Sequence, residues 1–194
     1  MSGTMAKIVL SLSVSLDGFF EAEDGAIDWH RVDEELHSHF NAELGRMGAF
    51  LSGRRTYELM ADYWPTADED PDAPAPVAEF AGIWRDMPKV VYSRTLGSAG
   101  WNSTVVRSVV PEEVRALKSS ATGDLALGGP DLAATFRRLG LLDSYRVYVH
   151  PVLLGRGRPW LAPEDDRADL ELVGTRAFGN GVVLLHYDVR GSEG

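Results

Sequence analysis

A glycine, two arginines and a threonine stand together within residues 51–57, where an apolar strand-like run passes into a helix-like one. The first N–H groups of a helix lack intrahelical partners, and these groups and the helix dipole attract anions. Gly53 lets a ligand approach the backbone closely, Thr56 offers a hydroxyl, and Arg54 and Arg55 add positive charge. We interpret this turn as an anion-binding site; the alternative is a plain tight turn with two solvated arginines.

A pair of glycines marks a second strand-to-helix turn, at residues 127–132. Gly128 and Gly129 allow the backbone to press against a pyrophosphate, and Pro130 can open a helix whose N-terminus points at it. Asp131 and Leu132 follow in the first turn of that helix. The spacing is neither the G-x-G-x-x-G dinucleotide fingerprint nor a P-loop, so the glycine pair alone is weak evidence.

Ser93 and Arg94 supply a third phosphate-binding group, directly after the predicted strand at 89–92. An arginine fork and a hydroxyl together can hold a phosphate by charge-assisted hydrogen bonds. The carboxyl ends of parallel strands lie at one edge of a sheet, where ligands bind. The three segments therefore predict one site for a phosphate-bearing ligand.

The elements that must position these turns alternate between strands and helices. Apolar, β-branched runs predict strands at residues 7–14, 49–52, 89–92, 104–106, 124–127, 145–150, 170–177 and 182–189. Periodicity and capping residues predict helices after Asp33, over 57–64, and from Pro111 and Pro130, whereas the acidic, proline-rich stretch 68–76 predicts a surface loop. This order predicts an α/β fold with a mostly parallel central sheet, helices on both faces and an antiparallel C-terminal hairpin around residues 179–181.

Composition disfavours several classes of function. The 194 residues carry a net charge of -10, which argues against binding to nucleic acid or to an anionic membrane surface. There is no cysteine and no apolar run of membrane-spanning length, so we expect a cytoplasmic protein without thiolate chemistry. His37 and His39 diverge on their predicted helix, and no metal site is expected.

Together these segments resemble the dihydrofolate reductase superfamily, and most of all the branch that contains the C-terminal reductase domain of the bifunctional riboflavin-biosynthesis deaminase-reductase. The resemblance extends over residues 7–190, which we interpret as one domain. It implies a three-layer α/β sandwich and an NADPH cofactor. The motifs that carry it are Asp17-Gly18, Gly53-Arg54-x-Thr56-Tyr57-Glu58, Tyr92-Ser93-Arg94-Thr95-Leu96, Gly128-Gly129-x-x-Leu132 and His150-Pro151-Val152-Leu153-Leu154-Gly155-x-Gly157.

The resemblance implies a role for each turn in holding NADPH. The Gly-Arg-x-Thr turn and the Ser-Arg pair hold the 2′-phosphate and the adjacent phosphates, and the Gly-Gly turn holds the pyrophosphate. The residues expected to bind the cofactor are Gly53, Arg54, Arg55, Thr56, Ser93, Arg94, Gly128, Gly129, Pro130, Asp131 and Leu132.

The substrate side is predicted from fewer residues. Asp17 and Glu34 are candidates to supply the proton, although Asp17 could equally be a turn aspartate bonded to its own backbone. Trp29 and Trp64 are candidates to line a pocket for a flat ring, the alternative being that they anchor the core, and Gly155 is assigned to the substrate side as well. The proline that precedes such a tryptophan in dihydrofolate reductases is missing before Trp29.

These features predict an NADPH-dependent reductase of a small planar heterocycle, resembling 5-amino-6-(5-phosphoribosylamino)uracil reductase of riboflavin biosynthesis. The alternatives are a true dihydrofolate reductase and a non-catalytic NADP(H)-binding protein. We also expect a homodimer, because the apolar run 182–185 needs cover on both faces near a sheet edge. The alternative is a monomer in which the loop 151–167 covers that run.

Overall fold

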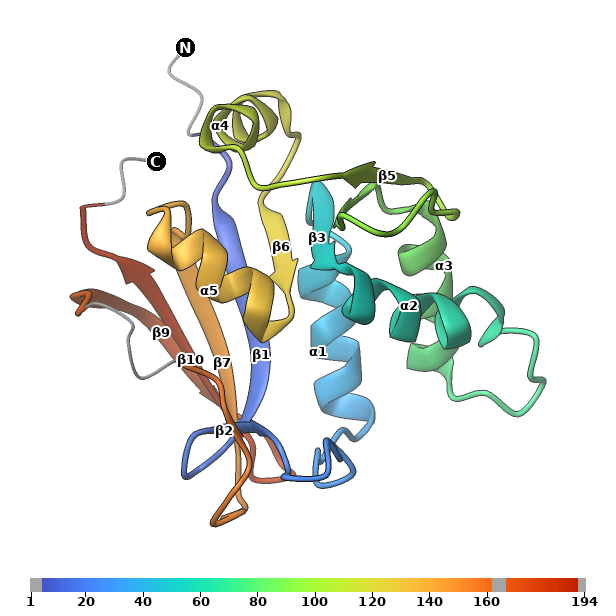
Figure 1. Ribbon diagram of the computed structural model, residues 1–194. Coiled ribbons are helices and arrows are strands. Elements are labelled where there is room, and N and C mark those ends of the chain that lie inside the picture. Colours follow the sequence, from blue (N-terminus) through green and yellow to red (C-terminus); the bar gives the residue numbers. More distant parts are fainter. Residues whose placement is uncertain (1–4, 162–166, 192–194) are drawn as a thin grey trace.

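An eight-stranded sheet forms the centre of the computed structural model, which describes residues 5–161 and 167–191 (Figure 1). Its strand order is β5-β4-β3-β6-β1-β7-β10-β9. All neighbouring pairs are parallel except those of β10, which runs antiparallel to β7 and β9. The strands are β1 (Ile8–Ser15), β3 (Ala49–Gly53), β4 (Lys89–Tyr92), β5 (Ser103–Val106), β6 (Leu125–Gly128), β7 (Ser144–His150), β9 (Leu170–Ala177) and β10 (Val183–Val189).

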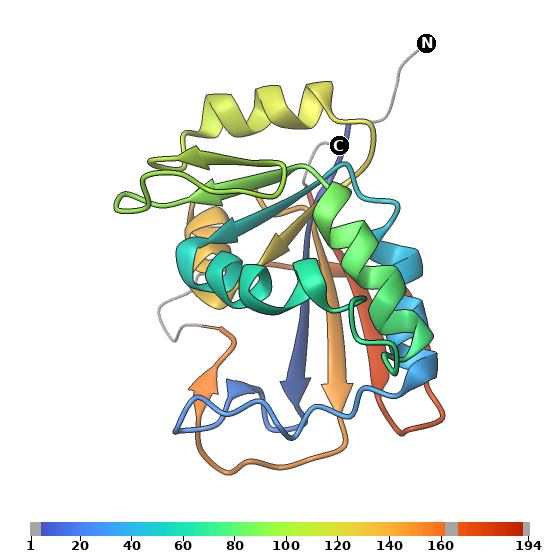
Figure 2. The ribbon, with the colours of Figure 1, turned by 90° about the vertical axis from the view of Figure 1, so that its right-hand side faces the viewer.

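Helices cover both faces of this sheet and make a three-layer sandwich. One face carries α4 (Pro111–Ser120) and α5 (Pro130–Arg138), whose Val114 and Phe136 are buried with Leu10 and Leu127 in the larger core cluster. The other face carries α1 (Glu34–Leu44), α2 (Arg54–Tyr63) and α3 (Ala75–Asp86), with a short 3-10 helix, η1 (Trp64–Thr66), after α2. Figure 2 shows α1 in blue and α3 in green side by side on that face.

A second, two-stranded sheet lies beyond the carboxyl end of β1. It pairs β2 (Phe19–Glu21) with β8 (Arg158–Pro159) in antiparallel fashion. The sequence did not predict these strands, because neither is long enough to show an alternating pattern. They matter for the site, since they bring the segment after β7 beside the segment after β1.

The predicted α/β architecture is confirmed, including the parallel centre and the C-terminal hairpin. The predicted cap is confirmed as well: the Asp33 carboxylate accepts the N–H of Leu36 at 3.0 Å. One helix was missed. Residues 68–76 were predicted as loop, but α3 begins at Ala75 and takes Pro76 into its first turn, where a proline needs no hydrogen-bond partner for its nitrogen.

The C-terminal edge differs from the expectation in one respect. Strand β10 lies inside the sheet, and Val182, just before it, is fully buried, so the run 182–185 is better covered than predicted. The edge strand is β9, where Leu172 and Val173 are 55% and 51% exposed. Residues 162–166 of the loop 151–167 lie outside the described residues. None of the described helices combines the length and hydropathy that crossing a membrane requires.

Candidate functional site

The two predicted anion-binding turns lie side by side. Strands β3 and β6 are neighbours, with Ser52 paired to Gly128, so the turns after them emerge together. A Cβ atom on Gly128 would lie 3.7 Å from Thr56 Cγ2, and one on Gly129 would lie 2.7 Å from Thr56 Oγ1. Gly129 also has φ +90°, which other residues rarely adopt. The close approach of the turns therefore depends on Gly129, whereas a Cβ on Gly128 would make only an ordinary contact with Thr56.

Two helix N-termini open at this junction. Gly53 is the N-cap of α2 and Gly129 the N-cap of α5, and neither helix has a side-chain hydrogen bond to its first turn among the described residues. In contrast, α1 carries a capping aspartate. The unpartnered N–H groups and the two helix dipoles make the junction suited to an anion such as a diphosphate.

Arginines surround the junction, as the sequence predicted. Arg54 Nη1 donates to Thr95 Oγ1 at 3.0 Å and its Nε lies 3.4 Å from Glu58, so this side chain connects α2 to the segment after β4. Arg55 is exposed, and its Nη2 lies 4.0 Å from the position of a Cβ on Gly25. Arg94 is exposed and has no ion pair or hydrogen bond within the described part of the chain. It is therefore available to an external phosphate.

Ser93 has a structural task besides any contact with a ligand. Its hydroxyl is buried and accepts the N–H groups of Thr95 and Leu96 at 3.3 and 3.0 Å. These bonds turn the chain directly after β4 and present Arg94 at the carboxyl edge of the sheet. In the predicted pair, Ser93 therefore stabilises the turn and Arg94 is exposed on it.

Asp17 is a fixed, ionised carboxylate. A hydrogen bond from the Ser15 hydroxyl, together with those from the N–H groups of Gly155 (2.7 Å) and Leu154 (3.1 Å), holds the pKa of Asp17 below its usual value. The predicted residues Asp17 and Gly155 are therefore in direct contact. The aspartate ties the loop after β7 to the turn after β1, rather than bonding only within its own turn.

The other predicted substrate-side residues, Glu34, Trp29 and Trp64, have different surroundings. Glu34 is exposed at the first position of α1. Trp29 packs edge-on against His150, with ring centroids 5.6 Å apart, over the end of β7. Trp64 instead packs edge-on against Phe80 at 4.5 Å, between η1 and α3. Within residues 5–161 and 167–191, the ring contacts of Trp29 are with His30 and His150, whereas those of Trp64 are with His37, Tyr63 and Phe80.

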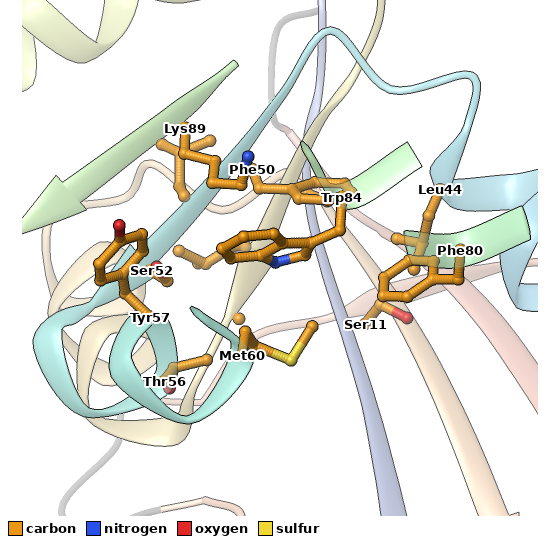
Figure 3. A pocket seen from close by; sticks show the side chains of 14 residues that line it. Ser11, Leu44, Phe50, Ser52, Thr56, Tyr57, Met60, Phe80, Trp84 and Lys89 are labelled. Atoms are coloured by element: carbon orange, nitrogen blue, oxygen red, sulfur yellow. The ribbon is translucent and has the colours of Figure 1, made fainter. Parts of the chain in front are cut away.

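A cavity of about 190 Å³ lies between the sheet and helices α1, α2 and α3 (Figure 3). Aromatic and aliphatic side chains form most of its wall, and the polar groups include the hydroxyls of Ser11, Ser52 and Thr56. Thr56 and Gly128 belong both to this cavity and to the junction of the turns. A ring bound in the cavity would therefore adjoin a ligand bound at the junction. The apolar lining residues are Leu44, Phe50, Leu51, Tyr57, Met60, Phe80, Trp84, Ala126 and Leu127.

The sequence did not reveal this cavity, since its lining residues follow the same periodicity as residues packed in a core. One of them is a charged residue in an apolar setting. Lys89 Nζ donates to the carbonyls of Met87 and Trp101 at 2.8 and 2.7 Å and lies 4.2 Å from the centroid of the Trp84 ring. Burial lowers the pKa of Lys89 to about 8. Its donors are already engaged, so the lysine stabilises the wall more than it offers a free cation to a ligand.

The model of one protein family, described as "RibD C-terminal domain", matches residues 6–184 of the chain. The chain belongs to this family. A relative, uncharacterized protein YyaP of Bacillus subtilis (strain 168), is 36% identical over 186 residues, which cover 95% of this chain and 96% of that protein.

Two solved structures share the fold of this chain. A putative riboflavin biosynthesis protein from Shewanella sp. PV-4 superposes with a TM-score of 0.72 at 18% identity, covering 95% of this chain and 99% of that one. The diaminohydroxyphosphoribosylaminopyrimidine deaminase/5-amino-6-(5-phosphoribosylamino)uracil reductase of Thermotoga maritima superposes with a TM-score of 0.63 at 16% identity, covering 95% of this chain and 57% of that one. The predicted family and fold are confirmed.

Proposed function

We propose that this protein is an NADPH-dependent reductase of a small planar ring compound. The observation that carries the proposal is the contact of two glycine turns at Thr56, beside an apolar cavity that Thr56 and Gly128 also line. The family generally uses NADPH, and the junction offers the N–H groups, the close approach at Gly129 and the exposed arginine that a dinucleotide phosphate chain needs. Bound NADPH would supply a hydride, and the second hydrogen of the product would arrive as a proton from water.

The residues of the chain then have separate tasks. The first turns of α2 and α5, with Gly128 and Gly129, hold the diphosphate, and Arg54 and Arg94 hold the 2′-phosphate. The ionised Asp17 keeps the loop at Gly155 closed against the turn after β1 and is too acidic to donate a proton near neutral pH. We assign Asp17 to positioning, and Glu34 remains a candidate for the proton pathway.

The volume of the cavity limits the size of the substrate ring system. Its volume of about 190 Å³ exceeds the ~150 Å³ that holds a benzene ring and falls below the ~300 Å³ at which drug-sized pockets begin. It therefore fits one ring or two fused rings, whereas a sugar phosphate attached to the ring would have to lie outside. An aminouracil resembling the intermediate of riboflavin biosynthesis meets this description if its ribose phosphate points to solvent.

Dihydrofolate reduction is the less favoured alternative. Such enzymes hold the pterin through a carboxylate, and no aspartate or glutamate of the described residues lines the cavity. The third possibility is a protein that binds NADP(H) without oxidising or reducing it. A kinetic measurement of NADPH oxidation distinguishes it from the two reductases.

The test is NADPH oxidation, followed at 340 nm, with aminouracils, their phosphoribosyl derivatives, dihydropterins and simple planar carbonyl compounds as acceptors. Binding of NADPH is measured separately by fluorescence titration. The proposal expects saturable binding of NADPH and turnover with at least one planar acceptor of the panel. Binding without turnover across the panel would favour a sensor, and no binding would refute the cofactor assignment.

A further inference from the structure

Arg158 is a cation beside the diphosphate turn that none of the motifs includes. Its guanidinium is shared between two carboxylates: Nη1 lies 3.5 Å from Glu21 on β2, and Nη2 is hydrogen-bonded to Asp131 in the first turn of α5. The Arg158 side chain is 34% exposed, whereas that of Asp131 is 89% exposed. One arginine of the small sheet therefore reaches the helix N-terminus at which the diphosphate is proposed to bind.

The backbone around Arg158 is held on both sides. Strand β8 pairs with β2, with Arg158 opposite Glu21. The preceding residue, Gly157, packs so closely on β2 that a Cβ there would collide with the carbonyl oxygen of Glu21. Further upstream, Asp17 fixes the loop at Gly155. These contacts hold the guanidinium near α5 before any ligand arrives, so little ordering entropy remains to be lost on binding.

The negative charge of Asp131 opposes binding of a diphosphate at α5, and the positive charge of Arg158 compensates for it. A carboxylate in the first turn of a helix is stabilised by the helix dipole. For the same reason it competes with an external anion for that turn, and it repels a diphosphate. The Arg158 guanidinium neutralises Asp131 in the free protein and has N–H groups in the fork geometry that suits phosphate oxygens.

We propose that Arg158 is a further cofactor-binding residue, which exchanges Asp131 for the diphosphate of the dinucleotide. This inference rests on the proposed function. The exchange is a change of hydrogen-bond partner and involves no covalent step. Arg158 and Arg94 should therefore affect different ligands. Arg158 would bind the diphosphate, which NADPH and NADH share, whereas Arg94 would bind the 2′-phosphate, which only NADPH has.

The test compares dissociation constants of the full chain and its variants for NADPH, NADH, ADP-ribose and 2′-AMP, measured by calorimetry. Arg158→Ala is expected to weaken the three diphosphate ligands about tenfold and to leave 2′-AMP within about twofold. Asp131→Asn is expected to tighten the same three ligands, by about threefold, because it removes the competing charge. Arg156→Ala is the matched control: it loses the same charge two residues away, where Arg156 is 79% exposed and faces Glu23 at 3.5 Å, and its affinities are expected to equal those of the wild type.

The opposite signs of the two main substitutions are decisive. If Arg158 only tethers β8 to α5, then Arg158→Ala and Asp131→Asn break the same tether and weaken binding alike, which overturns the inference. Equal weakening of 2′-AMP and ADP-ribose by Arg158→Ala also overturns it. If the wild type binds neither NADPH nor NADH, the proposed function fails and this inference fails with it. Should Arg158→Ala not fold, judged by circular dichroism, Arg158→Lys and Asp131→Asn provide the same comparison.

Discussion

His150 makes the stability of this protein depend on pH, and the size of the effect follows from its surroundings. The side chain is 0% exposed at the end of β7. Its Nδ1 accepts the backbone N–H of Arg31 at 3.0 Å, which requires that nitrogen to be unprotonated. The His30 ring stacks on it with centroids 5.1 Å apart. Burial, and next the positive charges that His30 and Arg31 carry or can acquire, lower the pKa of His150 to about 4.

The sign of the effect follows from the two pKa values. In the unfolded chain the imidazole titrates with a pKa near 6.5, whereas in the folded protein it stays neutral down to about pH 4. The stability contributed by this group is therefore fully present above pH 6.5 and is lost as the pH falls, because the unfolded state takes up the proton first. Between pH 6.5 and pH 5, about 1.5 units at ~1.36 kcal/mol each give a loss of about 2 kcal/mol. Burial of His30 shifts its pKa in the same direction and adds to the loss.

The substitution His150→Gln removes the titration and keeps a side chain that can accept the N–H of Arg31. We expect the variant to be less stable than the wild type at pH 7, and to lose about 2 kcal/mol less between pH 7 and pH 5. Urea unfolding at both pH values measures the difference, with equal m-values as the control that the same surface is exposed. If the wild type and the variant lose the same stability on acidification, the reasoning about His150 is wrong.

Three further predictions concern the cofactor turns and assembly. Arg94→Ala is expected to weaken NADPH about tenfold and NADH hardly at all, by fluorescence titration; equal losses would show that Arg94 does not bind the 2′-phosphate. Gly129→Ala is expected to destabilise the fold by about 1–3 kcal/mol from its backbone conformation alone, φ +90° and ψ 132°, and to abolish cofactor binding, since its Cβ would lie 2.7 Å from Thr56 Oγ1. Adding Thr56→Ala should recover part of the stability in thermal unfolding, and no recovery would mean that the clash is absent. The mass of the wild type measured by light scattering is expected to be twice the chain's 21.2 kDa. Leu172→Asp, on the exposed edge strand β9, is expected to give a monomer. A wild-type mass near 21.2 kDa would exclude the dimer.

Local signals in the sequence were sufficient for the larger elements and for the positions of the two glycine turns. The strands Lys89–Tyr92 and Leu170–Ala177 were predicted with the bounds they have. Each is a short run with apolar and β-branched residues, which favours an extended strand whether the run is half-buried, as in β4, or exposed at the edge, as in β9. The glycine turns were predictable because only a glycine suits the backbone of Gly129 and its approach to Thr56.

The features that were missed depend on contacts between segments distant in sequence. The cavity arises where α2 and α3 do not completely fill the space against β3, and no periodicity separates Phe50 or Trp84 from ordinary core residues. In the sequence, Arg158 is one arginine of a segment without a strand or helix pattern. Its position beside Asp131 follows from the pairing of β2 with β8, and these strands are too short to be predicted. Helix α3 was missed because Pro74 stands at its N-cap and Pro76 in its first turn, and these prolines were interpreted as part of a loop rather than as the start of a helix.

The place of β1 in the sheet has a consequence for how the chain reaches its native state. Strand β1 lies between β6 and β7, and the backbone N–H groups of Lys7 and Ile8 bond to side chains 117 and 135 residues further along the chain. Its apolar residues are therefore synthesised long before the strands that bury them. Such non-local pairing makes folding slow and leaves a β-prone segment exposed on the nascent chain. We expect refolding to be rate-limited by the docking of β1, and to be sensitive to chaperones that retain exposed apolar strands.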